Sequence, residues 1–225
     1  HDPRTQENGE WRGGAAIEPA RQSRSMTVHQ LLEIEVAPGC ARQALWAGAR
    51  LARRLAGRAG FRGLRVYRSE TGPETLLVLT EWEDEDAAAR AAGEATVARL
   101  LAQARLACAQ WDSRSLETLF HLHLPRRSPS AGMAWTLRAG ASPGGTAPGR
   151  QKEFGLKAMS LPGTIGVLGA RSTGDTGFLF GALEFETEQA RGDFAGSPTW
   201  HEWLRRAGPS AWCKEPRLDI QADQG

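Results

Sequence analysis

The stretch LTEWEDEDAAARA, residues 79–91, passes from an apolar run that favours a β-strand into a cluster of acidic residues and then into alanines. Carboxylates near the start of a helix interact with the positive end of the helix dipole, so this order predicts a strand followed directly by a helix. The stretch LEFETEQARGD, residues 183–193, has the same order. The chain therefore contains the same strand-to-helix junction twice.

The residues around the first junction predict one β-α-β-β-α-β unit. Residues 28–36 alternate between two faces as a strand does, and residues 41–56 carry apolar side chains at helical spacing. Two strands around the turn ETGPE, a helical region that reaches Cys108 with an interruption, and the strand SRSLETLFHLHL complete the unit. This order is that of a ferredoxin-like fold.

The same pattern starts again after PRRSPSAG, residues 125–132, and ends with a last strand at EPRLDIQ. Three matching pairs lie 103 to 105 positions apart: Gly39 and Gly144, Ser69 and Ser172, Trp82 and Phe185. A nearly constant offset indicates an internal duplication. We therefore predict an α+β chain with a flexible arm at 1–25, ferredoxin-like units at 26–124 and 132–222, and a linker at 125–131.

Composition and charge argue against several classes of function. The chain has 28 Lys and Arg and 26 Asp and Glu, a net charge of +2 that gives no reason to expect nucleic acid or a membrane surface as a partner. No apolar run approaches the roughly 18 residues that cross a bilayer. Three widely spaced cysteines and an N-terminal stretch without an apolar core argue against a disulfide framework and a secretory signal. We expect a cytoplasmic protein.

A strand that ends in EWE or EFE, an acidic helix start and the later helix SPTWHEWL resemble the antibiotic-biosynthesis monooxygenase family. The resemblance covers about 26–124 and again 132–222. In that family two such units pack sheet to sheet as a dimeric α+β barrel, and the lumen between the sheets holds the substrate. The resemblance therefore implies an intramolecular pseudo-dimer, monomeric or paired with a second copy, with a small aromatic molecule as its ligand.

The resemblance also implies a reaction, the oxygenation of an aromatic or polycyclic molecule such as a polyketide or quinone, without a metal or flavin. Well-studied members use an Asn four residues before the junction Trp and a Tyr six residues after it. Here Trp82 remains, but Val78 and Ala88 occupy those two positions. The haem-degrading branch uses an Asn and an axial His where this chain has Leu32 and Leu204. The alternatives are a ligand-binding or structural protein without catalysis, and a variant that depends on haem or a metal ion.

Aromatic residues at the junctions and on the SPTWHEWL helix are candidates for the wall of the substrate site. The candidates are Trp82, Phe185, Trp200 and His201, and Trp82 is also a candidate catalytic residue. Burial alone explains a tryptophan at a strand end, so packing is the alternative role.

Three histidines form a candidate site that the residues predict without the resemblance. His121 and His123 are two positions apart on a strand and share a face, and His29 lies on the polar face of the first strand. The fourth strand of a ferredoxin-like sheet pairs antiparallel with the first, which brings these residues together. Neutral imidazole is a common base and a common metal ligand, so we predict all three as catalytic residues or metal ligands, with Glu33 or Glu117 as a carboxylate neighbour. A polar rim without a metal is the alternative.

Overall fold

The computed structural model describes residues 27–69, 75–124, 129–138, 147–207, 210–214 and 220–221. The predicted arm, the ETGPE turn, Gly144 and most of the predicted linker lie outside the described residues. No helix within these ranges is long and apolar enough to cross a membrane.

The first unit has the predicted element order, with its second helical region divided in two. Its elements are β1 (Val28–Val36), α1 (Ala41–Leu55), β2 (Phe61–Ser69), β3 (Thr75–Trp82), α2 (Glu85–Gly93), α3 (Ala95–Arg105) and β4 (Cys108–His123). The acidic cluster starts α2, because the Asp84 carboxylate accepts a hydrogen bond from the backbone N–H of Ala87 at 2.7 Å. Glu94 separates α2 from α3 with an extended backbone.

The second unit repeats this order. Its elements are β5 (Ala131–Arg138), α4 (Ala147–Met159), β6 (Thr164–Ser172), β7 (Phe178–Phe185), α5 (Glu188–Ala195), α6 (Pro198–Ala207) and β8 (Ser210–Lys214). A short β9 (Ile220–Gln221) follows. β8 falls on SAWCK, before the predicted last strand EPRLDIQ, of which Ile220–Gln221 form β9 while 215–219 lie outside the described residues. Thr187 starts α5 as Asp84 starts α2, by accepting from the N–H of Ala190 at 3.0 Å.

The strand register confirms the duplication. The cross-strand pair Val28–Trp82 corresponds to the pair Ala131–Phe185 in the second unit. The pair Phe61–Trp82 corresponds to Thr164–Phe185 in the same way, and the offset is 103 positions in both cases. Gly60 and Gly163, also 103 apart, have φ of 80° and 78°. A Cβ on either glycine would lie within 2.5 Å of the Cβ of Ala87 or Ala190, so only glycine fits this turn below each junction.

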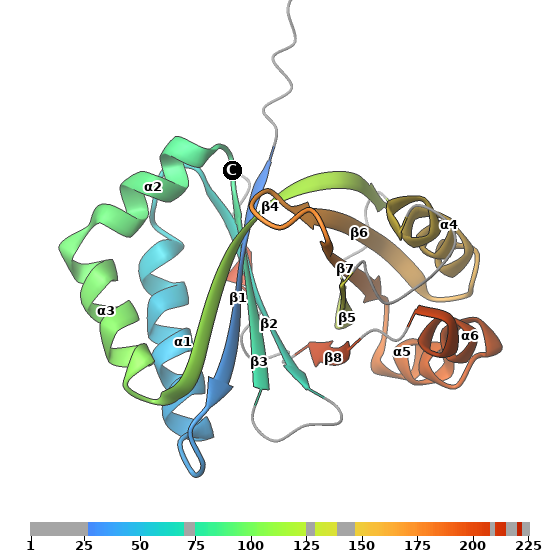
Figure 1. Cartoon of the computed structure of the whole chain (residues 1–225), viewed down its shortest axis with the longest axis horizontal. Helices are drawn as coiled ribbons and strands as arrows, with labels where there is room; N and C mark the ends of the chain where they lie inside the picture. The colour runs from blue at the N-terminus through green and yellow to red at the C-terminus, as the bar shows by residue number, and fades with distance from the viewer. Residues whose placement is uncertain are drawn as a thin grey trace, which may run out of the picture.

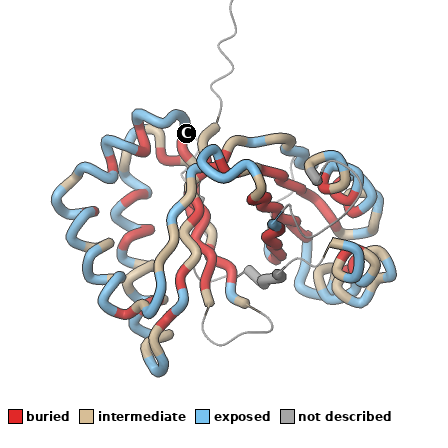
Figure 2. Tube along the Cα trace, viewed as in Figure 1, coloured by how far each residue is buried: buried red, intermediate tan, exposed pale blue. Residues whose placement is uncertain are grey.

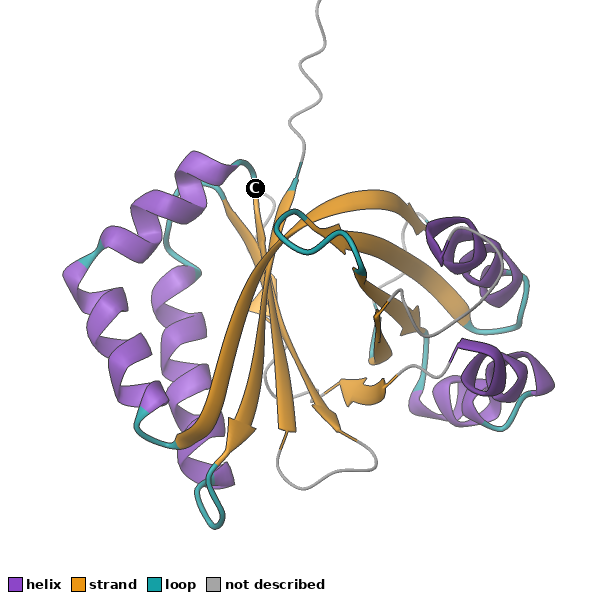
Figure 3. Cartoon of the chain, in the orientation of Figure 1, coloured by secondary structure: helices purple, strands orange, loops and turns teal. Residues whose placement is uncertain are grey.

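The two units form one closed barrel. The strands follow the order β3-β1-β4-β6-β7-β5-β8-β2, and β2 also pairs with β3. The units meet at two antiparallel seams, where β4 pairs with β6 and β2 pairs with β8. Helices α1–α3 cover the outside of one half of the barrel and α4–α6 the outside of the other (Figures 1 and 3). The predicted fold class, an intramolecular barrel of two ferredoxin-like α+β units, is confirmed, with the two sheets joined edge to edge.

Three apolar cores hold the barrel. One lies between the first unit's strands and α1–α3, and one between the second unit's strands and its helices. The third fills the middle of the lumen with side chains from both units, and the strands are correspondingly buried in Figure 2. Tyr67 and Phe180 meet there edge to face, with 6.3 Å between ring centroids. The middle of the lumen is therefore a packed apolar core.

Candidate functional site

Polar side chains gather at one end of the lumen, beyond its apolar middle. We call them the lumen-end cluster: His29 of β1, Arg65 of β2, Glu81 of β3, Thr118, His121 and His123 of β4, and Glu184 of β7. Strand register explains the convergence. His29 lies directly opposite Glu81 on the neighbouring strand, and Gly166 of β6 lies between His123 and Glu184.

A β-bulge in β4 aims the two histidines of that strand into the lumen. The register between β4 and β6 shifts between Thr118 and Phe120. As a result Phe120 packs in the second unit's outer core, while Thr118, His121 and His123 share the inner face. All three of these inner residues are exposed, so β4 lines the opening of the barrel end.

Arg65 joins the two units inside the cluster. Its Nη2 lies 3.8 Å from Glu81 Oε2 and 3.2 Å from Glu184 Oε1. The two glutamates occupy equivalent repeat positions, 103 apart, but the second unit has Leu168 where the first has Arg65 and Gly132 where the first has His29. The duplicated fold therefore contains one asymmetric cluster.

Gly166 makes room for the contact between His123 and Glu184. His123 Nε2 lies 3.5 Å from Glu184 Oε2. A Cβ added at Gly166 would lie 2.7 Å from that carboxylate oxygen and 3.1 Å from the His123 ring. Glycine is therefore needed at this position for the two side chains to meet across β6.

His29 is a buried, neutral imidazole. The residue is 1% exposed, and its Nδ1 lies 3.1 Å from Thr118 Oγ1. Its Nε2 lies 3.9 Å from Glu81 Oε2, beyond hydrogen-bonding distance, and has no hydrogen-bond partner among the described residues. Burial first, and then the positive charge of Arg65 and the neighbouring His121, lowers the pKa of His29 to about 3.

His121 is also neutral at neutral pH, but it reaches solvent. Desolvation of its ring lowers the pKa of His121, although the carboxylates of Glu81 and Glu184 act in the opposite direction. A neutral imidazole at an open barrel end can accept a proton, and the adjacent carboxylates stabilise the imidazolium that results. Arg65 and the unpartnered nitrogen of His29 offer donors for an anionic or carbonyl oxygen.

The predicted metal site is not formed. Within the described ranges, no three His, Cys, Asp or Glu side chains are grouped so that they could share a metal ion. The two ring nitrogens of His29 face Thr118 and Glu81, and His123 faces Glu184, so these two imidazoles do not point at one centre. Leu32 and Leu204, at the positions where the haem-degrading branch has its Asn and axial His, pack against the outer cores and offer no ligand.

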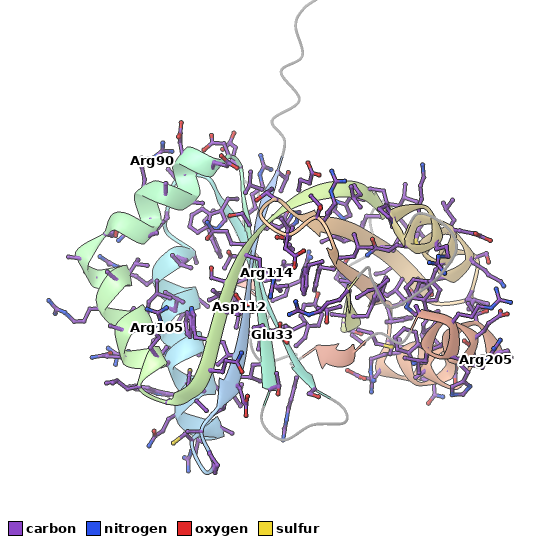
Figure 4. All side chains as sticks on the ribbon, in the orientation of Figure 1. Glu33, Arg90, Arg105, Asp112, Arg114 and Arg205 are labelled. Carbon is purple, nitrogen blue, oxygen red and sulfur yellow. The ribbon has the colours of Figure 1, made fainter. Side chains whose placement is uncertain are left out.

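The predicted carboxylate neighbours lie elsewhere. Glu33 is at the opposite end of the lumen, where its Oε2 lies 3.4 Å from Arg114 Nη1, next to Asp112 (Figure 4). Glu117 pairs with Arg171 on the outer side of the β4–β6 seam. The bulge in β4 explains the second error, since it places Glu117 on the face opposite to the histidines.

The predicted aromatic wall faces the helices and not the lumen. Trp82 is 2% exposed in the first outer core, where its Nε1 donates to Thr80 Oγ1 at 3.0 Å. Phe185 and Trp200 are buried in the second outer core, and His201 is exposed on α6. The positions of Trp82, Phe185 and Trp200 support a packing role, and His201 lies on the surface of α6.

Sequence reasoning missed Arg65, Glu81, Glu184 and Thr118. A signal existed for the glutamates, because each is the one charged residue of an otherwise apolar third strand, at the same repeat position in TLLVLTEW and FLFGALEF. A carboxylate in a buried strand requires a partner, which here is Arg65. No local pattern indicates Thr118, since its contact with His29 spans 89 positions.

A small apolar cavity lies on the other side of the first unit's sheet, between the strands and helices α1 and α3. Its lining includes Leu32, Val78, Leu51, Cys108 and Trp111. About 30 Å³ of it is open to the centre of a water-sized molecule, and the space of about 460 Å³ that no protein atom fills includes open solvent. Burial raises the pKa of the Cys108 thiol, so this wall is uncharged. The equivalent place in the second unit is filled, because Trp135 packs over Gly181 and against three other aromatic rings.

Residues 27–101 match the family model described as antibiotic biosynthesis monooxygenase. No curated protein matches the chain. A proposed monooxygenase from Fusobacterium nucleatum has a similar structure, with a TM-score of 0.67 and 12% identity over 89% of this chain and 96% of its own. A proposed monooxygenase from Lactobacillus acidophilus has a TM-score of 0.63 and 8% identity over 89% of this chain and 97% of its own. An anthrone oxidase-like protein has a TM-score of 0.58 and 11% identity over 90% of this chain and 95% of its own. These matches extend over both units, and at such identities they show a shared fold.

Proposed function

We propose that this chain is an oxidoreductase that oxygenates an aromatic small molecule at the lumen-end cluster. The proposal starts from the match of its first unit to the antibiotic biosynthesis monooxygenase family. One observation carries the proposal. Two neutral histidines, one buried and one reaching solvent, converge with two carboxylates and an arginine at an open end of the barrel. Pairs of titratable groups with perturbed pKa values are typical of catalytic sites.

The proposed substrate is an aromatic ketone with an acidic methylene, of the anthrone type. His121 accepts a proton from the substrate, and the resulting electron-rich anion is stabilised by Arg65 and reacts with dioxygen. For a methylene the balance is CH2 + O2 → C=O + H2O. One oxygen atom enters the product, and the other leaves as water with both hydrogens. The substrate supplies all the electrons, so the proposed reaction needs no metal, flavin or external reductant.

The three cysteines are widely spaced and do not indicate a disulfide framework, which supports a cytoplasmic location for this reaction. A single chain supplies every residue of the proposed site, since β7 of the second unit contributes Glu184 to groups from the first. The proposed active form is therefore the monomeric pseudo-dimer.

Oxygen uptake with anthrone as the substrate tests the proposal. We expect His121→Gln to lower kcat about 10²- to 10⁴-fold, because an amide cannot accept the proton. His201→Gln is the matched control, since His201 is exposed on α6 away from the cluster. Equal kcat values for His121→Gln and the parent would remove His121 from the reaction.

A second candidate function is ligand binding without catalysis in the apolar cavity of the first outer core. The observation that favours it is the replacement of the family's Asn and Tyr by Val78 and Ala88, with Val78 in the cavity wall. Val78→Phe would fill this cavity and leave the lumen-end cluster on the other face of the sheet intact. Loss of aromatic ligand binding in Val78→Phe, with no oxygen uptake in the parent, would favour this second function.

A further inference from the structure

The two ring nitrogens of His29 have different surroundings. Nδ1 lies within hydrogen-bonding distance of the Thr118 hydroxyl, at 3.1 Å. Nε2 is buried, has no hydrogen-bond partner among the described residues, and faces Glu81 Oε2 at 3.9 Å. A neutral imidazole has one donor and one acceptor nitrogen, and a hydroxyl can be the donor or the acceptor in the contact with Nδ1.

The carboxylate of Glu81 favours one of the two neutral tautomers of His29, which carry the proton on Nδ1 or on Nε2. If Nδ1 carried the proton, the lone pair of Nε2 would face a negatively charged oxygen at 3.9 Å in a buried setting. If Nε2 carries the proton, the N–H dipole points toward that charge, which is favourable at low effective dielectric. Thr118 must then be the donor to Nδ1.

We propose that Thr118 donates its hydroxyl hydrogen to Nδ1 of His29, so that His29 carries its proton on Nε2 and presents this N–H to a ketone or phenolate oxygen of the ligand. Thr118 is then a positioning residue. Glu81, at 3.9 Å, is too far away to accept a hydrogen bond from this N–H, so a ligand oxygen that accepts from it gains affinity. The second unit has Gly132 at the position equivalent to His29, so it has no imidazole donor at that position.

The tautomer is measured without a ligand and does not depend on the proposed function. In a ¹⁵N-histidine-labelled full chain, long-range ¹H–¹⁵N correlation spectra identify which ring nitrogen carries the proton, and His29→Gln assigns the signals. We expect Nε2–H in the parent. Thr118→Val should move the Nδ1 resonance toward that of an imidazole nitrogen with no donor, and Thr118→Ser should restore it. A proton on Nδ1, or an Nδ1 resonance that Thr118→Val leaves unchanged, would overturn the assignment.

The ligand class rests on the proposed function and is tested with two matched probes. Anthraquinone-2-sulfonate has ring carbonyls, and anthracene-2-sulfonate lacks them. We expect the parent to bind the quinone about three- to tenfold more tightly, the ratio that one net hydrogen bond gives. His29→Phe should remove this preference. Equal affinities in the parent, or no binding of the quinone, would overturn the ligand assignment, whereas absent oxygen uptake with this preference intact would overturn only the oxygenation.

Discussion

At the scale of single residues, the lumen-end cluster depends on the balance between one guanidinium and two carboxylates. Arg65, Glu81 and Glu184 have side chains that are 13%, 20% and 8% exposed, so their charges are largely removed from water. Separating such a group from its partner costs more than the pair itself contributes, because the remaining charge stays buried. Arg65 therefore holds together carboxylates from both halves of the barrel.

Arg65→Met keeps the apolar stem of the side chain and removes its charge. We expect the free energy of unfolding at pH 7 to fall by about 3–5 kcal/mol in denaturant titrations, because Glu184 is left buried without a cation. The double variant Arg65→Met/Glu184→Gln should recover part of this loss. Arg206→Met is the control, since its pair with Glu202 is on the surface of α6, and we expect a change below about 1 kcal/mol. An Arg65→Met variant as stable as the parent would show that the pair has no structural role.

His29 gives the cluster a dependence on pH. The pKa of His29 is lowered from 6.5 to about 3 in the folded chain, so below pH 6.5 the unfolded chain binds a proton that the folded chain does not. Stability should therefore fall as the pH drops from 6.5 toward 3, by up to about 1.4 kcal/mol per pH unit from this residue. His29→Gln has no such proton, so the difference in unfolding free energy between the variant and the parent should shift in favour of the variant over this range. A difference that stays constant between pH 7 and pH 4 would contradict a neutral buried His29.

At the scale of elements, the strand-to-helix junction could be predicted from the sequence and the bulge in β4 could not. The cap at Asp84 and the aromatic residue that closes the end of β3 both follow from local composition. In LETLFHLH the alternation looks regular, and nothing in it indicates the extra residue between Thr118 and Phe120. Side-chain direction reverses at a bulge, so a regular alternation predicts Glu117 on the face of the histidines although it lies on the other face.

Trp82 tests the packing role of the junction. The indole is 2% exposed, meets Phe61 edge to face at 5.3 Å and donates to Thr80. We expect Trp82→Ala to lower the free energy of unfolding by about 3–5 kcal/mol, because it leaves a cavity in the outer core. Trp46→Ala should change it by less than about 0.5 kcal/mol, since Trp46 is 60% exposed on α1. Similar stabilities for these two variants would contradict the packing role.

At the scale of the whole molecule, the duplication is visible in the sequence but the seams are not. A constant offset of 103 predicts two units with the same internal register. The seams pair β4 with β6 and β2 with β8, and these contacts join residues that share no local pattern. The candidate site is likewise predictable from the sequence in one part and not in another. The convergence of His29 with β4 follows from the ferredoxin-like order, whereas Glu184 arrives only because the second unit closes the barrel.

The shared lumen core predicts a single unfolding transition. Leu31 and Tyr67 of the first unit pack with Phe180 of the second, so neither unit keeps its inner face buried alone. Far-ultraviolet circular dichroism and tryptophan fluorescence should therefore report the same midpoint in a denaturant titration. Two separate midpoints would show that the units fold independently.

The proposed reaction is the oxygenation of an aromatic substrate by dioxygen alone at the lumen-end cluster of this barrel. Its most direct test is the incubation of metal-free protein with anthrone under ¹⁸O2, without a reductant, followed by mass spectrometry of the product. We predict one ¹⁸O atom in the product carbonyl at a rate that depends on the parent protein and falls about 10²- to 10⁴-fold in His121→Gln. Product that forms no faster with the parent than without protein, or equally fast with His121→Gln, would contradict the claim.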